Sequence, residues 1–352
     1  MLGIRYPLLM AGMAGGYTTP QLVAAVTRAG GLGTFGATGM TAAALGEAVT
    51  TALSLCPGPL GVNVLVAPPT QGNPREEEVD AALAPVRAEL GLPPPPRPAG
   101  LPPASARELV EAGLAAGARV VSVGLGDPAT VADLARTAGV PVVAMAATVE
   151  DAVRAVRGGA DVIVAQGAEA GGHRSNFTVG PGGEVPLVGT LALVPQVVRA
   201  VDVPVVAAGG IMDGRGVVAA LALGAEGAQL GTAFLLAAEA ASPPLYRERL
   251  AGAADTDTVV TAAVTGRPAR MLRSALVERL AAGPAPVSWP RQGAMITDVR
   301  VAADRAGRAD LAVHLAGQAS GLAGDAQRGA EEILAGIVRQ AGDTIARLAS
   351  GA

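Results

Sequence analysis

Short apolar runs recur along this chain, and each is followed by small residues and then by a helical pattern. Eight such runs can be recognised, at residues 8–13, 31–35, 61–66, 119–123, 141–146, 161–165, 204–208 and 227–231. Strands that are apolar throughout are typical of a parallel sheet covered on both faces by helices. Eight strand–helix units close most simply into a barrel, so the sequence predicts an α/β fold of the (β/α)8 TIM barrel type.

Capping residues predict where several of the helices begin. Thr19 and Asp127 each precede a proline, which is favoured at the first position of a helix. Thr148 and Asp213 precede two further helical patterns. These positions support the alternation of strands and helices.

Two stretches depart from this alternation and predict the domain organisation. Residues 67–104 contain four consecutive prolines and read as an excursion between the third and fourth strands, and residues 237–310 are also rich in proline. We predict a barrel over 1–236, a small and mainly helical inserted cap over 237–310, and a C-terminal helix over 311–352 that returns to the barrel.

The rarest residue types exclude several kinds of chemistry. All 26 basic residues are arginine, so mechanisms that need a lysine Schiff base or a P-loop lysine are excluded. The single cysteine, Cys56, excludes an internal disulfide and a multi-cysteine metal site. Only His173 and His314 are histidines, which disfavours a histidine-rich metal centre.

Charge and hydrophobicity limit the partners and the location. A net charge of −4 without basic clusters argues against nucleic-acid binding. The N-terminal residues do not resemble a signal peptide, and the most apolar stretch, 217–241, reads as a buried helix followed by a buried strand rather than as a membrane span. We expect a cytoplasmic protein, and its Ala-rich helices are compatible with a homodimer.

Polar residues at strand ends identify the predicted site, because barrels bind ligands at the carboxyl ends of their strands. The first strand ends in small residues that let a flat ligand approach the backbone. Asn63 and Gln166 are amides within or at the end of apolar strands, where a buried amide needs a partner, either a heterocyclic ligand or a neighbouring loop. His173 follows a Gly-Gly pair in the next loop, and its near-neutral pKa suits a general base. The candidate residues in this part of the site are Ala11, Gly12, Met13, Asn63, Gln166, Gly171, Gly172 and His173.

The ends of the seventh and eighth strands predict a phosphate site. Glycines at these two positions, followed by helix N-termini, bind phosphate in many barrels, although each could also be simply a tight turn. Together with the two amides and the Gly-rich platform, they suggest FMN as the cofactor. The candidate residues here are Gly209, Gly210, Gln229, Leu230, Gly231 and Thr232.

Several segments together resemble the nitronate monooxygenase family, and the resemblance covers nearly the whole chain. The segments are 11–15 (AGMAG), 61–63 (GVN), 165–174 (AQGAEAGGHR), 191–196 (LALVPQ), 207–215 (AAGGIMDGR), 229–234 (QLGTAF), 265–270 (TGRPAR) and 316–318 (AGQ).

The resemblance implies that an alkyl nitronate is oxidised by O2 on FMN to a carbonyl compound and nitrite. It also implies that His173 is the catalytic base and that FMN is contacted by Asn63, Gln166, Gly171, Gly210 and residues 229–232. The main alternative is an FMN-dependent enoyl-thioester (enoyl-ACP) reductase that uses NAD(P)H, because such enzymes share the Gly-Gly-His sequence. A flavin-binding protein without turnover and a barrel isomerase are further alternatives.

Overall fold

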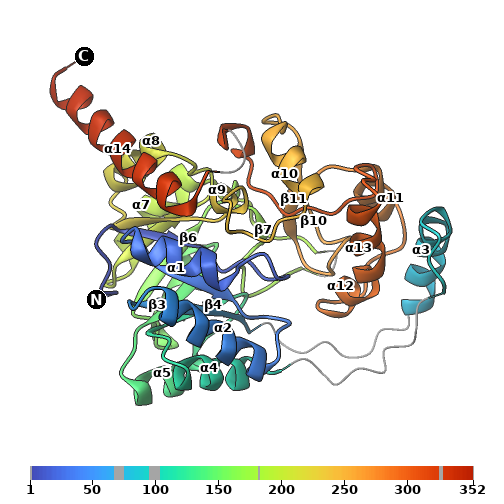
Figure 1. Cartoon of the computed structure of the whole chain (residues 1–352), viewed down its shortest axis with the longest axis horizontal. Coiled ribbons are helices and arrows are strands. Elements are labelled where there is room, and N and C mark those ends of the chain that lie inside the picture. Colours follow the sequence, from blue (N-terminus) through green and yellow to red (C-terminus); the bar gives the residue numbers. More distant parts are fainter. Residues whose placement is uncertain (1, 67–74, 95–103, 181–182, 325–327, 352) are drawn as a thin grey trace.

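The computed structural model describes residues 2–66, 75–94, 104–180, 183–324 and 328–351. Its main feature is a parallel sheet of eight strands surrounded by helices (Figure 1). The sheet strands are β1 (Leu8–Met10), β2 (Gly33–Gly36), β3 (Leu60–Leu65), β4 (Val120–Gly124), β5 (Val142–Ala146), β6 (Val162–Gln166), β8 (Val205–Ala208) and β9 (Gly227–Leu230). Each strand falls at one of the eight predicted apolar runs.

The sheet closes into a barrel between its first two strands. The order of strands is β1-β9-β8-β6-β5-β4-β3-β2, and a parallel bridge between Leu9 and Leu32 joins the two ends. At this bridge Met10 N donates to Leu32 O (2.9 Å) and Leu32 N donates to Leu8 O (2.9 Å). The predicted TIM barrel is thereby confirmed, with β8 and β9 as its seventh and eighth strands.

Helices α1, α2 and α4 to α8 follow the strands along the chain, and the long helix α14 returns to the barrel. Three of the predicted caps are confirmed, since the side chains of Thr19, Thr148 and Asp213 accept hydrogen bonds from the first turns of α1, α6 and α8. Asp127 caps the short 3₁₀ helix at Pro128–Thr130. The helices that pack on the barrel are α1 (Pro20–Arg28), α2 (Ala42–Leu55), α4 (Ala106–Ala115), α5 (Ala132–Ala138), α6 (Val149–Arg157), α7 (Thr190–Ala200), α8 (Gly214–Ala222), α9 (Thr232–Leu235), α10 (Pro244–Ala251) and α14 (Ala330–Ala349). Of these, α10 falls in the range predicted for the cap, but its Tyr246 and Leu250 belong to the apolar core of the barrel.

Alternation along the strands decides which side chains enter the barrel. Val62 and Val64 of β3 belong to the large apolar core between the sheet and the helices. Asn63 lies between them, so its side chain points to the barrel interior, because successive strand residues point to opposite faces. A separate apolar cluster, which includes Leu9, Val143 and Val164, fills the interior below the strand ends.

The cap has its own apolar core and lies beside the barrel (Figure 1). It contains α11 (Ala275–Ala281), α12 (Arg291–Met295) and α13 (Thr297–Arg305), together with two antiparallel strands, β10 (Thr258–Thr261) and β11 (Ala269–Leu272). The sequence did not predict these strands. Strand β11 also pairs with the two-residue strand β7 (Gly172–His173), which comes from the loop after β6.

Helix α3 (Glu76–Glu89) comes from the predicted excursion between the third and fourth strands and packs into the core of the cap. The remainder of the excursion at 67–74 and 95–103 lies outside the described residues. Arg87 of α3 is buried and donates to Asp298 Oδ2 of α13 (2.9 Å). The packing favours a cap core made from two chain segments, and the boundaries at 236 and 310 stay a prediction.

None of the helices in the described part of the chain combines the length and the apolar character that a membrane crossing requires.

Candidate active site

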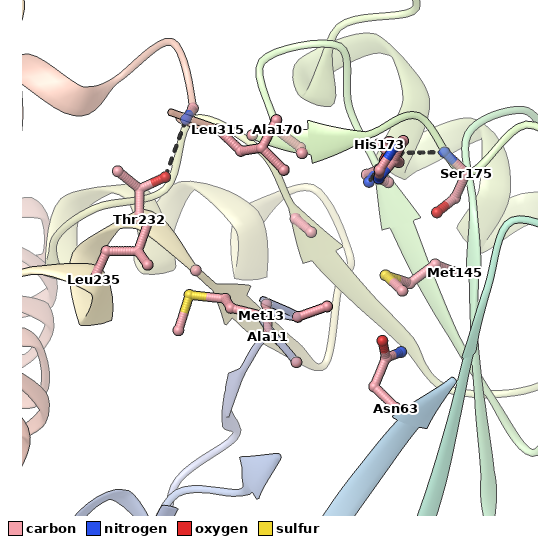
Figure 2. Close-up of a pocket in the computed structure, with 18 of the residues that line it drawn as sticks. Ala11, Met13, Asn63, Met145, Ala170, His173, Ser175, Thr232, Leu235 and Leu315 are labelled. Carbon is pink, nitrogen blue, oxygen red and sulfur yellow. Dashed lines mark hydrogen bonds between the residues drawn. The ribbon is translucent and has the colours of Figure 1, made fainter. Parts of the chain in front are cut away.

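A cavity of about 420 Å³ lies at the carboxyl ends of the barrel strands, between the barrel and the cap. Figure 2 shows His173, Ser175 and Met145 on one side of it, Thr232, Leu235 and Leu315 on the other, and Met13 between them. Every site residue predicted from the sequence lines this one cavity: Ala11, Gly12, Met13, Asn63, Gln166, Gly171, Gly172, His173, Gly209, Gly210, Gln229, Leu230, Gly231 and Thr232.

Three amide side chains reach the cavity from the barrel interior, and neighbouring strands fix their positions. Asn63 pairs in register with Ser122, and its Nδ2 donates to Ser122 Oγ (2.9 Å). Gln166 and Gln229 both lie in register with Ala208, so they share one level of the barrel. Since all three amides are at least nine-tenths buried, the polar atoms that they present to the cavity are shielded from bulk water.

Gln166 also holds the loop that carries the histidine. Its Nε2 donates to His173 O (2.9 Å), and its Oε1 accepts from Ser175 N (2.8 Å). Both functional groups of this amide are therefore engaged with the backbone on either side of Arg174, the residue that follows His173. The sequence predicted a ligand contact at Gln166, with a structural hydrogen bond to a neighbouring loop as the alternative, and the hydrogen bonds of this amide are of the second kind.

His173 lies where the barrel and the cap meet. Strand β7, which contains it, pairs with β11 of the cap, and the next residue continues the contact because Arg174 N donates to Pro268 O (2.8 Å). The imidazole Nε2 lies 3.0 Å from Thr265 Oγ1, and the ring of Trp289 meets the imidazole edge-on at 6.3 Å between centroids. Desolvation and, to a smaller extent, the Arg267 guanidinium lower the pKa of His173 to about 4, so the ring is neutral at pH 7.

Two buried arginines bind backbone carbonyls in and around the loop that carries His173. Arg174 is fully buried and donates to Gln166 O (2.9 Å) and to Gly167 O, and burial lowers its pKa to about 10. Arg267 of the cap donates to Leu125 O (3.1 Å) and to Asn176 O. Because these guanidinium groups bind backbone carbonyls, they anchor the loop that presents His173.

The ends of β8 and β9 form a glycine-lined wall. Gly209 (φ 111°) and Gly210 (φ 71°) have left-handed backbone conformations that side chains with a Cβ disfavour. After the neighbouring strand β1, Gly12 leaves no room for a side chain, since an added Cβ would lie 2.5 Å from Asn63 Cβ. Thr232 begins the short helix α9, and its Oγ1 accepts from Gly317 N (3.0 Å).

The cap and neighbouring loops contribute lining residues that the sequence did not single out as part of the site. They include Thr265, Trp289, Arg300, Tyr17 and Tyr246. Thr265 lies within the motif at 265–270, and Trp289 is the sole tryptophan, so the sequence offered a reason to consider both as site residues. Arg300 lies in a helix of ordinary composition, and no pattern marks it.

His314, the second histidine, is a structural residue outside the cavity lining. It is fully buried and stacks on Tyr246 with 4.2 Å between ring centroids. Its Nδ1 accepts from Arg249 (3.1 Å), and its Nε2 lies 2.8 Å from Asp304 Oδ1. Nowhere in the described ranges do three or more His, Cys, Asp or Glu residues gather in a way that could hold a metal ion.

A parallel barrel with a neutral histidine over a strand-end cavity defines the chain as a barrel enzyme, and comparisons with known proteins identify its family. The nitronate monooxygenase family model matches residues 1–340. A probable nitronate monooxygenase of Staphylococcus aureus strain JH9 is 37% identical over 346 residues, which cover 97% of this chain and 95% of the relative. A second from Staphylococcus saprophyticus is 39% identical over 282 residues, or 80% of this chain and 79% of the relative.

Two solved structures are similar to this chain over nearly its whole length. The nitroalkane oxidase of Streptomyces ansochromogenes superposes with a TM-score of 0.88 at 34% identity and covers 98% of both chains. FabK of Thermotoga maritima superposes with a TM-score of 0.72 at 30% identity and covers 100% of this chain and 97% of that one. This chain belongs to the nitronate monooxygenase family of oxidoreductases, in which a flavin cofactor is typical.

Proposed function

We propose that this protein oxidises alkyl nitronates, or the corresponding nitroalkanes, with O2 to a carbonyl compound and nitrite. The observation that carries the proposal is the neutral His173, whose ring lines the cavity at the strand ends of the barrel. The match to the family over 1–340 and the likeness to a nitroalkane oxidase support the same substrate class.

We propose FMN as the cofactor, because the residues at the strand ends suit it. The loops after the seventh and eighth strands and the N-terminus of a short extra helix are a recurrent phosphate site in such barrels. Here those elements are the left-handed glycines after β8 and the start of α9, and both line the cavity. Backbone amides suffice for this role in a chain without lysine. The volume of about 420 Å³ lies within the range of cofactor pockets.

The residues divide into those that would hold the phosphate and those that would face the ring system. Gly209, Gly210, Gly231 and Thr232 would hold the phosphate. The ring system would be faced by the small residues after β1, by the amides and by the glycines before the histidine, namely Ala11, Gly12, Met13, Asn63, Gln166, Gln229, Leu230, Gly171 and Gly172.

FMN, when bound, supplies the acceptor for the electrons of the nitro compound. His173 acts on the proton. A neutral imidazole accepts the proton bound to the carbon next to the nitro group, and the electron pair of that C–H bond remains on the substrate as the nitronate. Burial and Arg267 favour the neutral, basic form of the ring before substrate binds.

Nitrite release tests the proposal. Purified enzyme is given an alkyl nitronate or a nitroalkane in air, and nitrite is measured for the wild type and for His173→Asn. We expect nitrite from the wild type and a much slower reaction of the variant with the nitroalkane. Absence of nitrite from every nitro compound tested contradicts the proposed function, whereas equal rates for both proteins with the nitroalkane remove His173 from the mechanism.

The enoyl-thioester reductase remains the second candidate, because the chain is also similar to FabK, although with a lower TM-score than to the nitroalkane oxidase. Mixing the enzyme with NADPH in the absence of air separates the two. Rapid bleaching of flavin absorbance supports the reductase, and unchanged absorbance supports oxidation of nitro compounds. The cytoplasmic location and the homodimer stay predictions.

A further inference from the structure

The His173 ring has a defined partner on the cap. His173 Nε2 lies 3.0 Å from Thr265 Oγ1, and the same hydroxyl donates to Arg267 O (2.9 Å). A carbonyl oxygen only accepts, so the single hydroxyl proton of Thr265 is directed to Arg267 O. The hydroxyl therefore offers a lone pair to the imidazole, and both hydrogen bonds form together only when His173 carries its proton on Nε2.

The loop that carries Thr265 is held firmly between β10 and β11. Gly266 has a φ of 81°, and an added Cβ there would lie 2.2 Å from Val287 O. Trp289 N donates to Gly266 O (3.3 Å), and Gln292 Nε2 donates to Ala263 O (2.9 Å). The hydroxyl is thus fixed by backbone contacts on both sides of Thr265.

We propose that Thr265 is a positioning residue, which fixes the Nε2–H tautomer of His173 and leaves Nδ1 as the atom that accepts the substrate proton. The proposal rests on the proposed function, since it assigns the atom through which His173 acts as a base. Among the described residues, Nδ1 has no hydrogen-bond partner, while the ring itself lines the cavity.

The tautomer matters because only one nitrogen of a neutral imidazole is basic. When Nδ1 accepts the proton from the carbon next to the nitro group, the C–H bond breaks and its electron pair stays on the nitronate. The ring becomes an imidazolium, and its bond from Nε2–H to Thr265 becomes charge-assisted and stronger. Without the hydroxyl, the penalty that Thr265 places on the Nδ1–H tautomer is lost, so more of the rings carry their proton on Nδ1, which is then not basic.

The two histidines of this chain allow a direct test by ¹⁵N NMR of histidine-labelled protein. His173→Asn identifies the signal of His173. His314 is an internal reference, because Arg249 can only donate to its Nδ1 and so fixes its Nε2–H tautomer independently. We expect the Nε2–H tautomer for His173 in the wild type and in Thr265→Ser, and a substantial Nδ1–H population in Thr265→Val. An Nδ1–H ring in the wild type, or an unchanged tautomer in Thr265→Val, overturns the proposal.

A matched control separates positioning from general damage to the loop. Thr261 Oγ1 accepts from Ala263 N (3.1 Å) close to the same loop, but it makes no hydrogen bond with the His173 side chain. Thr261→Val should therefore leave the tautomer of His173 unchanged. A shift of the same size in this variant overturns the assignment to the Thr265 hydroxyl.

Kinetics give the second readout. A neutral nitroalkane must lose a proton to His173, whereas a preformed nitronate has already lost it. Thr265→Val should lower kcat/KM by about 10- to 100-fold with the nitroalkane and by less than about 3-fold with the nitronate, and Thr265→Ser should restore the first value. Equal losses with both substrates overturn the proposal, as does a wild type that oxidises only the nitronate. A wild type that oxidises neither substrate refutes the proposed function itself.

Discussion

Replacing Gln166 by methionine removes an amide that the backbone around His173 depends on. The unbranched methionine side chain keeps nearly the same volume at a position that is only 6% exposed. The substitution leaves Ser175 N without its partner at 2.8 Å and His173 O without its partner at 2.9 Å. Since Ser175 is itself buried, water does not readily replace the lost amide.

The expected loss of stability follows from these two groups. A buried donor or acceptor that loses its partner costs about 1–3 kcal/mol, so the two together cost about 2–6 kcal/mol of unfolding free energy. Urea unfolding at 25 °C measures this loss, in protein stripped of any bound cofactor so that a change in cofactor affinity does not contribute. The transition midpoint should fall while its slope remains unchanged.

Gln196→Ala is the matched control, because Gln196 is exposed on α7 and its Nε2 donates only to Ala192 O of the same helix. It should change the unfolding free energy by less than about 0.5 kcal/mol. A loss below about 1 kcal/mol for Gln166→Met, or equal losses for both variants, would refute the reasoning that this amide holds the histidine loop.

Three further predictions concern the cavity. His173→Asn should lower kcat/KM with a neutral nitroalkane by about 10²- to 10⁴-fold, measured as nitrite release, and unchanged flavin absorbance would show that the site is intact. Gly210→Ala should cost about 1–2 kcal/mol of stability because of its φ of 71° and should also weaken flavin binding measured by fluorescence titration. Gly139→Ala is the control, because Gly139 has a φ of 65° and open space around it. This variant should lose the same stability and keep its flavin affinity, and equal flavin affinities of the two variants would contradict the assignment of Gly210 to the phosphate. The pKa of His173 is lowered to about 4, so the ring stays neutral and basic down to about pH 5. The value of kcat/KM with a nitroalkane should therefore stay level from pH 8 to about pH 5 and fall only below that. A fall with a midpoint near pH 6.5 would contradict the lowered pKa.

Much of the barrel could be predicted because its signals are local. A strand that is buried on both faces is a continuous apolar run, whichever strands it pairs with. The capping side chains of Thr19, Thr148 and Asp213 bind backbone N–H groups no more than three residues further along the chain. The strands β10 and β11 were not predicted, since short strands in a proline-rich segment form only where another strand is available to pair with them. Helix α3 joined the cap through contacts such as that between Arg87 and Asp298, which are 211 residues apart.

The sequence by itself determined which residues gather at the site. Parallel connections bring the carboxyl ends of all barrel strands to one edge, so residues as distant as Ala11 and Thr232 had to line a common cavity. Only the tertiary structure decided what each polar atom binds there. The Gln166 amide binds the backbone of the loop that carries His173. The Thr265 hydroxyl lies beside the His173 ring, although the two residues are 92 positions apart in the sequence. Hydrogen bonds of this kind form only when donor and acceptor lie within a few tenths of an ångström of their preferred separation, and the packing of the cap on the barrel sets that separation.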